Sequence, residues 1–304
     1  MRKSEIAKAI ELRQSTIKDF LLCPLMFKYR HIDKLKPSFR NPAALHGSTL
    51  HKLIEWIHTL NWNLNVAEFY REVYAYFEFM KAEEKDIPVF WKSNRELELS
   101  EYEQNAVEIL DGYRKRPENQ NAKVLYSETE FRVRIAGYMF TGTIDQVREN
   151  EDGSTELIDY KTGKQMPSVA FLHNDWQLNI YLYALKFGQL KVNDQWIKPN
   201  LLPTYSSWYF LRSHEIRKRT TVNGSAGEEK GTALIRTHKG MPELKQFRQD
   251  LSNLLKIMLK PWHYPNPNSC GFCAYAEMCI KRNKDLSADL VKEARRLIDE
   301  TEAA

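Results

Sequence analysis

The sequence predicts an α/β protein in which a short mixed sheet is flanked by helices. Three neighbouring segments rich in β-branched and aromatic residues, 123–135, 141–148 and 154–161, indicate strands joined by short turns. Segments with the helical spacing of apolar residues precede and follow them, and two more strand-like segments, 205–212 and 232–238, come later. We expect the helices to cover the sheet.

The composition indicates a soluble, globular protein. The 304 residues are enough for one large domain or two ordinary ones, and we place a single domain over residues 1–304. No apolar run approaches the roughly 18 residues of a membrane span, and the N-terminal segment MRKSEIAKAIELRQ lacks the apolar part of a signal peptide. We therefore expect an intracellular, cytoplasmic protein with no membrane partner. The net charge of +5 permits nucleic-acid binding without demanding it.

Helices are predicted before the sheet. Ser15 is the expected N-cap of the first helix, which Pro24 ends just after Cys23. Residues 41–60 form a second helix, and His51 borders its apolar stripe. A histidine in that place is more often a core residue than a ligand. Residues 61–120 contain two further helical patterns and are expected to form a helical insertion without identifiable chemistry.

The hairpin formed by residues 141–148 and 154–161 is the centre of the prediction. If Glu151, Asp152 and Gly153 form a three-residue loop with Gly153 left-handed, residues whose numbers sum to 304 face each other. Asp145 then lies opposite Asp159, and like charges in that position are destabilising unless something neutralises them. A divalent cation would do so.

The same hairpin places an amine beside the two carboxylates. Side chains alternate along a strand, so Asp159 and Lys161 share a face. Hard oxygen ligands suit Mg²⁺ or Mn²⁺, and a nearby cation can orient water and stabilise charge on a phosphoryl group. An exposed hairpin with scattered charges is the alternative interpretation. Glu128 and Glu130, on the preceding strand, can approach the site, but solvent-facing carboxylates are the favoured interpretation.

The residues that follow the central hairpin carry fewer motifs that indicate a function. Residues 167–187 are predicted to be mainly one helix, in which Gln177 and Tyr181 are neighbours on one face. Such a pair can contact a phosphate or base, although packing against the sheet is the commoner role. A polar loop is expected over residues 213–231, and amphipathic helices over 242–260 and 285–300.

Four cysteines indicate a second site. Cys270, Cys273 and Cys279 form a C-x2-C-x5-C pattern, and Cys23 lies alone near the other end of the chain. Four thiolates would need Cys23, so we expect it to join residues 261–282 in a clasp between the two ends of the chain. Loss of the bound group should then destabilise the fold. Zinc and an iron-sulfur cluster both satisfy four thiolates, and free buried cysteines are the third possibility.

Several of these pieces together resemble a known family. They are His51, Gly142-Thr143-Ile144-Asp145, Asp159-Tyr160-Lys161-Thr162-Gly163, Gln177 to Tyr181, and the four cysteines. In this order they are similar to the RecB-type nucleases of the restriction-endonuclease-like, or PD-(D/E)XK, superfamily. The similarity is greatest to iron-sulfur members such as the CRISPR-associated adaptation exonuclease and its phage relatives.

The resemblance implies a restriction-endonuclease-like core and a role for each motif. His51, Asp145, Asp159 and the Tyr160 carbonyl would bind Mg²⁺ or Mn²⁺, and Lys161 would assist catalysis. Gln177 and Tyr181 would support the substrate or the site geometry. The cysteines Cys23, Cys270, Cys273 and Cys279 would hold a [4Fe-4S] cluster rather than zinc. Two departures stand out: Asp159 replaces the commoner Glu, and the segment between His51 and Asp145 is longer than in compact members.

The function expected from this resemblance is a metal-dependent deoxyribonuclease. The predicted substrate is single-stranded DNA, degraded from its ends by an exonuclease. A DNA-binding or scaffold protein without turnover, carrying a zinc or iron-sulfur structural site, is the main alternative. A zinc-clasped protein of another function is the second.

Overall fold

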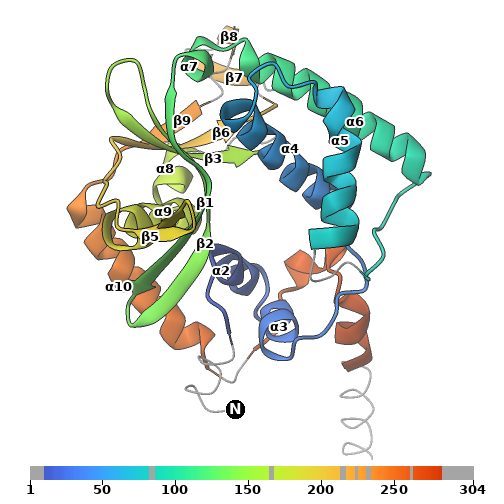
Figure 1. Cartoon of the computed structure of the whole chain (residues 1–304). Helices are drawn as coiled ribbons and strands as arrows, with labels where there is room; N and C mark the ends of the chain where they lie inside the picture. Colours follow the sequence, from blue (N-terminus) through green and yellow to red (C-terminus); the bar gives the residue numbers. More distant parts are fainter. Residues whose placement is uncertain are drawn as a thin grey trace, which may run out of the picture.

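The computed structural model describes residues 10–81, 86–163, 168–212, 217–222, 225–230, 234–260 and 263–282. Within these ranges a seven-stranded sheet has the strand order β5-β4-β1-β2-β3-β6-β9 (Figure 1). Its strands are β1 (Lys123–Ile135), β2 (Tyr138–Glu149), β3 (Thr155–Lys161), β4 (Gln189–Val192), β5 (Gln195–Ile197), β6 (Tyr205–Phe210) and β9 (Leu234–Thr237). Strands β3 and β6 are parallel and the other neighbours are antiparallel. The mixed sheet flanked by helices is therefore confirmed.

The central hairpin has the predicted register. Strands β2 and β3 pair Gln146 with Ile158 and Arg148 with Glu156. The loop closes through a hydrogen bond from the Asn150 N–H to the Ser154 carbonyl, at 2.8 Å, and Gly153 has a φ of +77°. Only glycine adopts this conformation at no steric cost, which is why a three-residue loop forms here. Continuing the register by one position puts Asp145 across from Asp159.

One face of the sheet is covered by α2 (Gln14–Leu22), α9 (Trp176–Phe187) and α10 (Met241–Met258). The predicted helix over 167–187 is divided into α8 (Val169–His173) and α9, because the Asp175 side chain accepts a hydrogen bond from the Leu178 N–H and caps a new helix. The start of α2 was also misplaced. Its N-cap is Arg13, not Ser15, and the Arg13 N–H donates to the Thr16 hydroxyl.

The other face is covered by α4 (Pro42–Thr59), α5 (Val66–Ala75) and α6 (Arg95–Arg114). The Asn41 side chain caps α4, and the predicted apolar stripe of α4 is buried against Ile158 and Tyr160 of β3. Helix α5 continues into a π-helical turn, η2 (Tyr76–Lys81), and the short α7 (Pro117–Gln120) follows α6. These helices lie on the opposite side of the sheet from α9 and α10 (Figure 1).

The remaining elements join the two ends of the described chain. Cys23 separates α2 from α3 (Pro24–Phe27), which continues into η1 (Lys28–Ile32), and η3 (Pro267–Phe272) packs beside them. The predicted loop over 213–231 instead contains a two-stranded ribbon, β7 (Arg217–Val222) and β8 (Ser225–Lys230). The helix predicted over 285–300 lies outside the described residues. Nowhere in the described ranges does a helix combine the length and hydropathy needed to cross a membrane.

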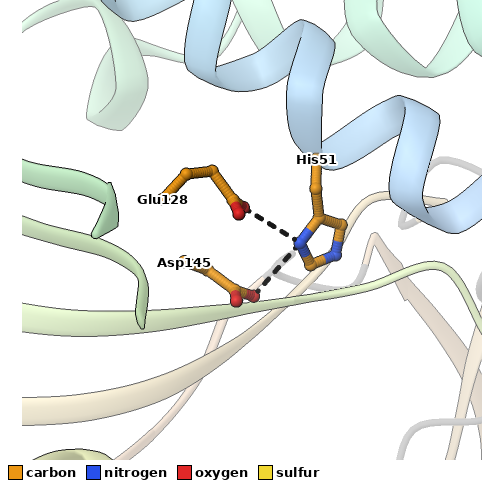
Figure 2. A group of neighbouring side chains, drawn as sticks. All are labelled: His51, Glu128 and Asp145. Atoms are coloured by element: carbon orange, nitrogen blue, oxygen red, sulfur yellow. Dashed lines mark ion pairs between the residues drawn. The ribbon is translucent and has the colours of Figure 1, made fainter. Parts of the chain in front are cut away.

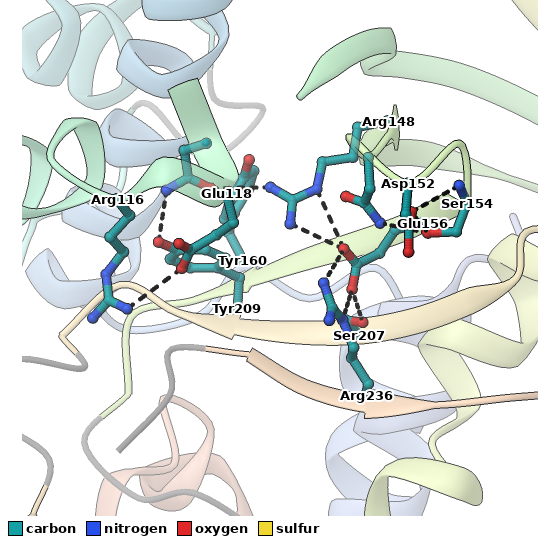
Figure 3. A network of polar contacts seen from close by, with 12 residues as sticks. Arg116, Glu118, Arg148, Asp152, Ser154, Glu156, Tyr160, Ser207, Tyr209 and Arg236 are labelled. Atoms are coloured by element: carbon teal, nitrogen blue, oxygen red, sulfur yellow. Dashed lines mark hydrogen bonds and ion pairs between the residues drawn. The ribbon is translucent and has the colours of Figure 1, made fainter. Parts of the chain in front are cut away.

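A buried ion-pair network fastens the hairpin to the rest of the sheet (Figure 3). The fully buried Arg148 donates to Glu156 at 2.9 Å and to the Asn119 side chain at 3.0 Å. Arg236 and Ser207 also donate to Glu156, at 2.7 and 2.5 Å. Burial alone would raise the pKa of Glu156, but these partners lower it below its usual value. The network therefore ties β2 and β3 to β6 and β9.

Candidate metal and catalytic site

Helix α4 directs His51 onto two carboxylates of the sheet (Figure 2). The His51 Nδ1 lies 3.3 Å from Glu128 and 3.5 Å from Asp145, and its Nε2 lies 3.2 Å from the Tyr160 carbonyl oxygen. One nitrogen and two carboxylate oxygens from these three side chains come within 4.8 Å of one another. Such a set of ligands can hold a divalent cation.

The backbone of Tyr160 orients both His51 and Asp145. Its N–H donates to the buried Asp145 carboxylate at 2.8 Å, while its carbonyl accepts from His51. Burial alone would lower the pKa of His51, but the carboxylates of Asp145 and Glu128 outweigh it and raise the pKa to about 9. Because a metal would have to displace that proton, ligand binding and protonation at His51 are coupled.

Asp159 lies deeper than the other carboxylates. It is 1% exposed and pairs with the Lys161 ammonium. Apart from that ammonium, neither of its carboxylate oxygens has a hydrogen-bond partner among the described residues. Burial and the neighbouring charge of Asp145 raise the pKa of Asp159 to about 6 despite Lys161. A buried carboxylate with so few partners is costly, and an additional cation would satisfy it.

Lys161 is held from two sides. Its ammonium donates to the Gln177 side-chain oxygen at 3.0 Å, and the Gln177 amide donates to the Tyr181 hydroxyl at 2.9 Å. The ammonium also lies 4.8 Å from the centre of the Trp208 ring. Burial would lower the pKa of Lys161, but the charge of Asp159 outweighs it and raises the pKa above its usual value. The ammonium thus stays charged in a fixed position.

All the residues predicted for this site come from neighbouring elements, but their arrangement differs from the prediction in one respect. In the described part of the chain the tight ligand group is His51, Glu128 and Asp145, so Asp159 lies outside it, beside Lys161. The Tyr160 carbonyl faces His51, as a shared ligand position would require. The Gln177 side chain contacts Lys161 and is itself hydrogen-bonded to Tyr181, so this pair does more than pack against the sheet.

The surroundings of Glu128 differ from those predicted from the sequence. The favoured interpretation, a solvent-facing strand carboxylate, holds for the exposed Glu130 but is wrong for Glu128, whose side chain is 23% exposed and faces His51. Glu128 has a φ of +43°, a conformation that non-glycine residues rarely adopt and that often marks functional sites. It lies across from Asp145, between the pairs Ser127↔Gln146 and Thr129↔Ile144.

A cleft of about 430 Å³ gives access to the ligand group. Its walls include Gly47 and Ser48 of α4, Phe77 of η2 and Thr162 after β3, together with His51 and Glu128. A substrate in this cleft would reach His51 and Glu128 of the ligand group.

The four cysteines surround a separate cavity of about 230 Å³. Cys23 comes from the break between α2 and α3, Cys270 from η3, Cys273 from the position directly after η3, and Cys279 from the helical residues 276–282 that follow. All four are free thiols, and no three of these described sulfur atoms come within 4.8 Å of one another. The Asn266 N–H approaches the Cys23 sulfur at 3.4 Å. Burial, and then the neighbouring cysteines, raise the pKa of Cys273 and Cys279.

An imidazole and buried carboxylates beside a fixed lysine, on a mixed sheet flanked by helices, define a candidate metal-dependent hydrolase. Comparison with protein families gives the same result. The model of the PD-(D/E)XK nuclease superfamily matches residues 11–280, and the chain belongs to this superfamily. Nucleases of this superfamily use divalent metals, and a member would act on DNA.

Comparisons with curated proteins and with solved structures do not narrow the function further. No curated protein matches the sequence. Among solved structures, the chain is similar to one described as "Crystal structure of SSO0001", with 15% identity over 86% of this chain and 95% of that chain. The TM-score is 0.33, too low to bear on fold or function.

Proposed function

We propose that the protein is a Mg²⁺- or Mn²⁺-dependent deoxyribonuclease that degrades single-stranded DNA from its ends. The observation that carries the metal-dependent hydrolysis is Asp159, a buried carboxylate that lacks a full set of partners, pairs with Lys161 and interacts with the charges of Asp145 and His51. The exonuclease mode and the single-stranded substrate rest on the resemblance of the ordered motifs.

The donor set fits a divalent cation. His51, Glu128, Asp145, Asp159 and the Tyr160 carbonyl would hold it, and these are mostly the hard oxygen donors that Mg²⁺ and Mn²⁺ prefer. Bound there, the ion would lower the pKa of a water molecule and stabilise charge on the phosphoryl group.

Lys161 supplies the chain's own contribution to the reaction. Gln177 and Tyr181 fix its direction, and Asp159 keeps it protonated. An ammonium in that state can donate hydrogen bonds to a non-bridging phosphate oxygen and to the attacking water. Charge that develops during phosphodiester hydrolysis is stabilised best by donors that are already oriented.

The cysteine cavity supports a [4Fe-4S] clasp formed by Cys23 and residues 261–282. A tetrahedral zinc site with Zn–S bonds of about 2.3 Å requires sulfurs only about 3.8 Å apart. No three of the four described sulfurs come within 4.8 Å of one another, and the cavity between them leaves room for a cubane, which places iron and sulfide between the thiolates. The Asn266 N–H toward Cys23 is the kind of contact that stabilises a cluster sulfur.

The two cofactors can be told apart by colour. We expect anaerobically purified protein to be brown, with broad visible absorption and about four irons per chain for a [4Fe-4S] cluster. A colourless protein that contains zinc would favour the zinc-clasped alternative instead.

The nuclease activity is tested with single-stranded DNA labelled at either end. We expect Mn²⁺ to support digestion and EDTA to stop it, with product lengths that report the direction of attack. A protein that binds the strand but leaves both labels at full length would be the non-catalytic DNA-binding or scaffold protein. The complete set of Asp145, Asp159 and Lys161 favours turnover.

A further inference from the structure

Large apolar side chains are exposed along the turn η2. Phe79 is 54% exposed and Met80 is 72% exposed, and the neighbouring Tyr76 is exposed as well. Phe90 of a nearby segment is 56% exposed. Exposed apolar groups that gather in one place mark binding surfaces. We call Tyr76, Phe77, Phe79, Met80 and Phe90 the aromatic strip.

The aromatic strip is held in a defined conformation. The buried Arg40 guanidinium donates to the Glu78 carbonyl at 2.7 Å and to the Ile87 carbonyl at 3.0 Å. The Phe90 N–H donates to the Arg40 carbonyl, and the rings of Phe39 and Phe90 lie 5.4 Å apart. Arg40 therefore fixes η2 and the segment that carries Phe90 relative to each other.

The aromatic strip continues into the candidate active site. Phe77 lines the same cleft as His51 and Glu128, and η2 contacts α4, which carries His51. Figure 1 shows the end of α5, from which η2 continues, beside α4. A ligand bound to the ligand group would therefore lie beside Phe77, from which the rest of the strip continues along η2.

The charges of the cleft argue against binding through phosphates alone. Glu55, Glu128 and Glu130 line it, and Lys52, which also lines it, is paired with Glu55 at 2.6 Å. Backbone phosphates would meet mainly carboxylates there, so a DNA strand needs another source of affinity. Base stacking on aromatic side chains is available to an unpaired strand and not to bases stacked inside a duplex.

We propose that the aromatic strip stacks against unpaired nucleobases next to the scissile phosphate, with Phe77 as the ring closest to the ligand group. This inference rests on the proposed function and gives it a structural basis for selecting single strands. Phe77 and Phe79 are then specificity-determining residues, whereas Lys161 and the carboxylates carry out the hydrolysis.

Two substrates separate stacking from chemistry. One is a fluorescein-labelled single-stranded oligonucleotide, compared with the same strand carrying abasic sites near its ends. The other is bis(p-nitrophenyl) phosphate with Mn²⁺, a phosphodiester too small to reach the whole strip. Phe77→Ala, Phe77→Trp and Phe79→Ala are compared with Phe187→Ala, which removes an exposed ring at the end of α9 on the other face of the sheet.

We expect Phe77→Ala and Phe79→Ala to raise KM and Kd for the normal strand by about 5- to 100-fold, as for the loss of one stacked base. The affinity of both variants for the abasic strand should stay at the wild-type level. Phe79→Ala, whose side chain does not line the cleft, should also hydrolyse bis(p-nitrophenyl) phosphate at the wild-type rate. Phe77→Trp should restore affinity, and Phe187→Ala should change nothing. Because Phe79 is exposed, Phe79→Ala keeps the test valid if Phe77→Ala folds poorly.

The possible failures are distinct. Equal Kd of the wild-type protein for the normal and abasic strands would overturn the stacking inference, even if both phosphodiesters are hydrolysed. Absence of hydrolysis of either substrate would overturn the proposed function. Fluorescence anisotropy measured without Mn²⁺ would then still decide whether the aromatic strip binds bases.

Discussion

The Lys161 ammonium donates a hydrogen bond to the Gln177 side-chain oxygen at 3.0 Å, which joins the end of β3 to the first turn of α9. Gln177 lies in the first turn of α9 because the Asp175 side chain, two residues earlier in the chain, caps this helix. The direction of the lysine is therefore set by a helix packed on the sheet, and not by the strand alone.

Replacing Gln177 by Ala should slow the reaction without unfolding the protein. Loss of a hydrogen bond to a charged group is worth about 1.5–3 kcal/mol, so kcat should fall by about 10- to 100-fold with little change in KM. Tyr181→Phe removes only the partner of the Gln177 amide and should have a smaller effect. Steady-state kinetics on a single-stranded oligonucleotide measures both, and wild-type kcat for Gln177→Ala would count against this role.

The face of Trp208 should help to keep Lys161 protonated. A cation over an indole ring gains roughly 0.5–2 kcal/mol, and the two groups lie 4.8 Å apart. Trp208→Leu should shift the alkaline limb of the pH–rate profile to lower pH, because the ammonium loses this partner. Trp208→Phe keeps an aromatic face and is the control. Identical profiles for the two variants would show that the ring only fills space.

The affinity for Mn²⁺ should rise with pH. The pKa of His51 is raised to about 9, so between pH 6 and 9 the metal must displace one proton, and affinity should increase about tenfold per pH unit. Below about pH 6 the slope should steepen, because Asp159, with a pKa near 6, also binds a proton. Isothermal titration calorimetry in two buffers counts the protons released, and His51→Ala should release fewer. A pH-independent affinity would contradict His51 as a ligand.

Much of this geometry follows from local turn chemistry. The loop around Gly153 fixes the register of β2 and β3, and so the position of Asp145 relative to Asp159. The turn at Ala136 and Gly137, where φ is +50° and +89°, fixes β1 in the same way. Because that register sets Glu128 across from Asp145, the position of Glu128 also follows from the sequence.

Other features depend on contacts between distant parts of the chain, which the spacing of apolar residues does not indicate. The place of Trp208 beside Lys161 follows from the parallel pairing of β6 with β3, two strands far apart in the chain. The gathering of Cys23 with the C-terminal cysteines was predicted from the number of ligands needed, and the structure places all four around one cavity. The break between α8 and α9 at Asp175 was missed, because a capping carboxylate outweighed an apolar pattern that runs through it.

The buried Glu156 should make stability depend on pH. Its pKa is lowered, so its stabilising contribution is complete above the ordinary value near 4.5 and is lost as the pH falls through the lower folded-state pKa. At pH 7, Glu156→Gln should destabilise the protein by about 3–5 kcal/mol, because Arg148 loses its buried partner. At pH 3 the difference from wild type should shrink.

Urea denaturation at both pH values measures this effect. Glu149→Gln is the matched control, because Glu149 pairs with Lys123 at the surface and its loss should cost less than about 1 kcal/mol. A Glu156→Gln variant as stable as Glu149→Gln at pH 7 would mean that the buried network does not hold the hairpin in place.

The most direct test of the catalytic centre is the Lys161→Ala variant, studied for Mn²⁺ binding and for single-turnover cleavage of end-labelled single-stranded DNA. We expect it to fold and to bind Mn²⁺ through the remaining carboxylates and His51, but to cleave about a hundred- to a thousandfold more slowly than wild type, as when a preorganised donor is lost. Cleavage by Lys161→Ala at the wild-type rate would contradict the assignment of this site as the nuclease centre.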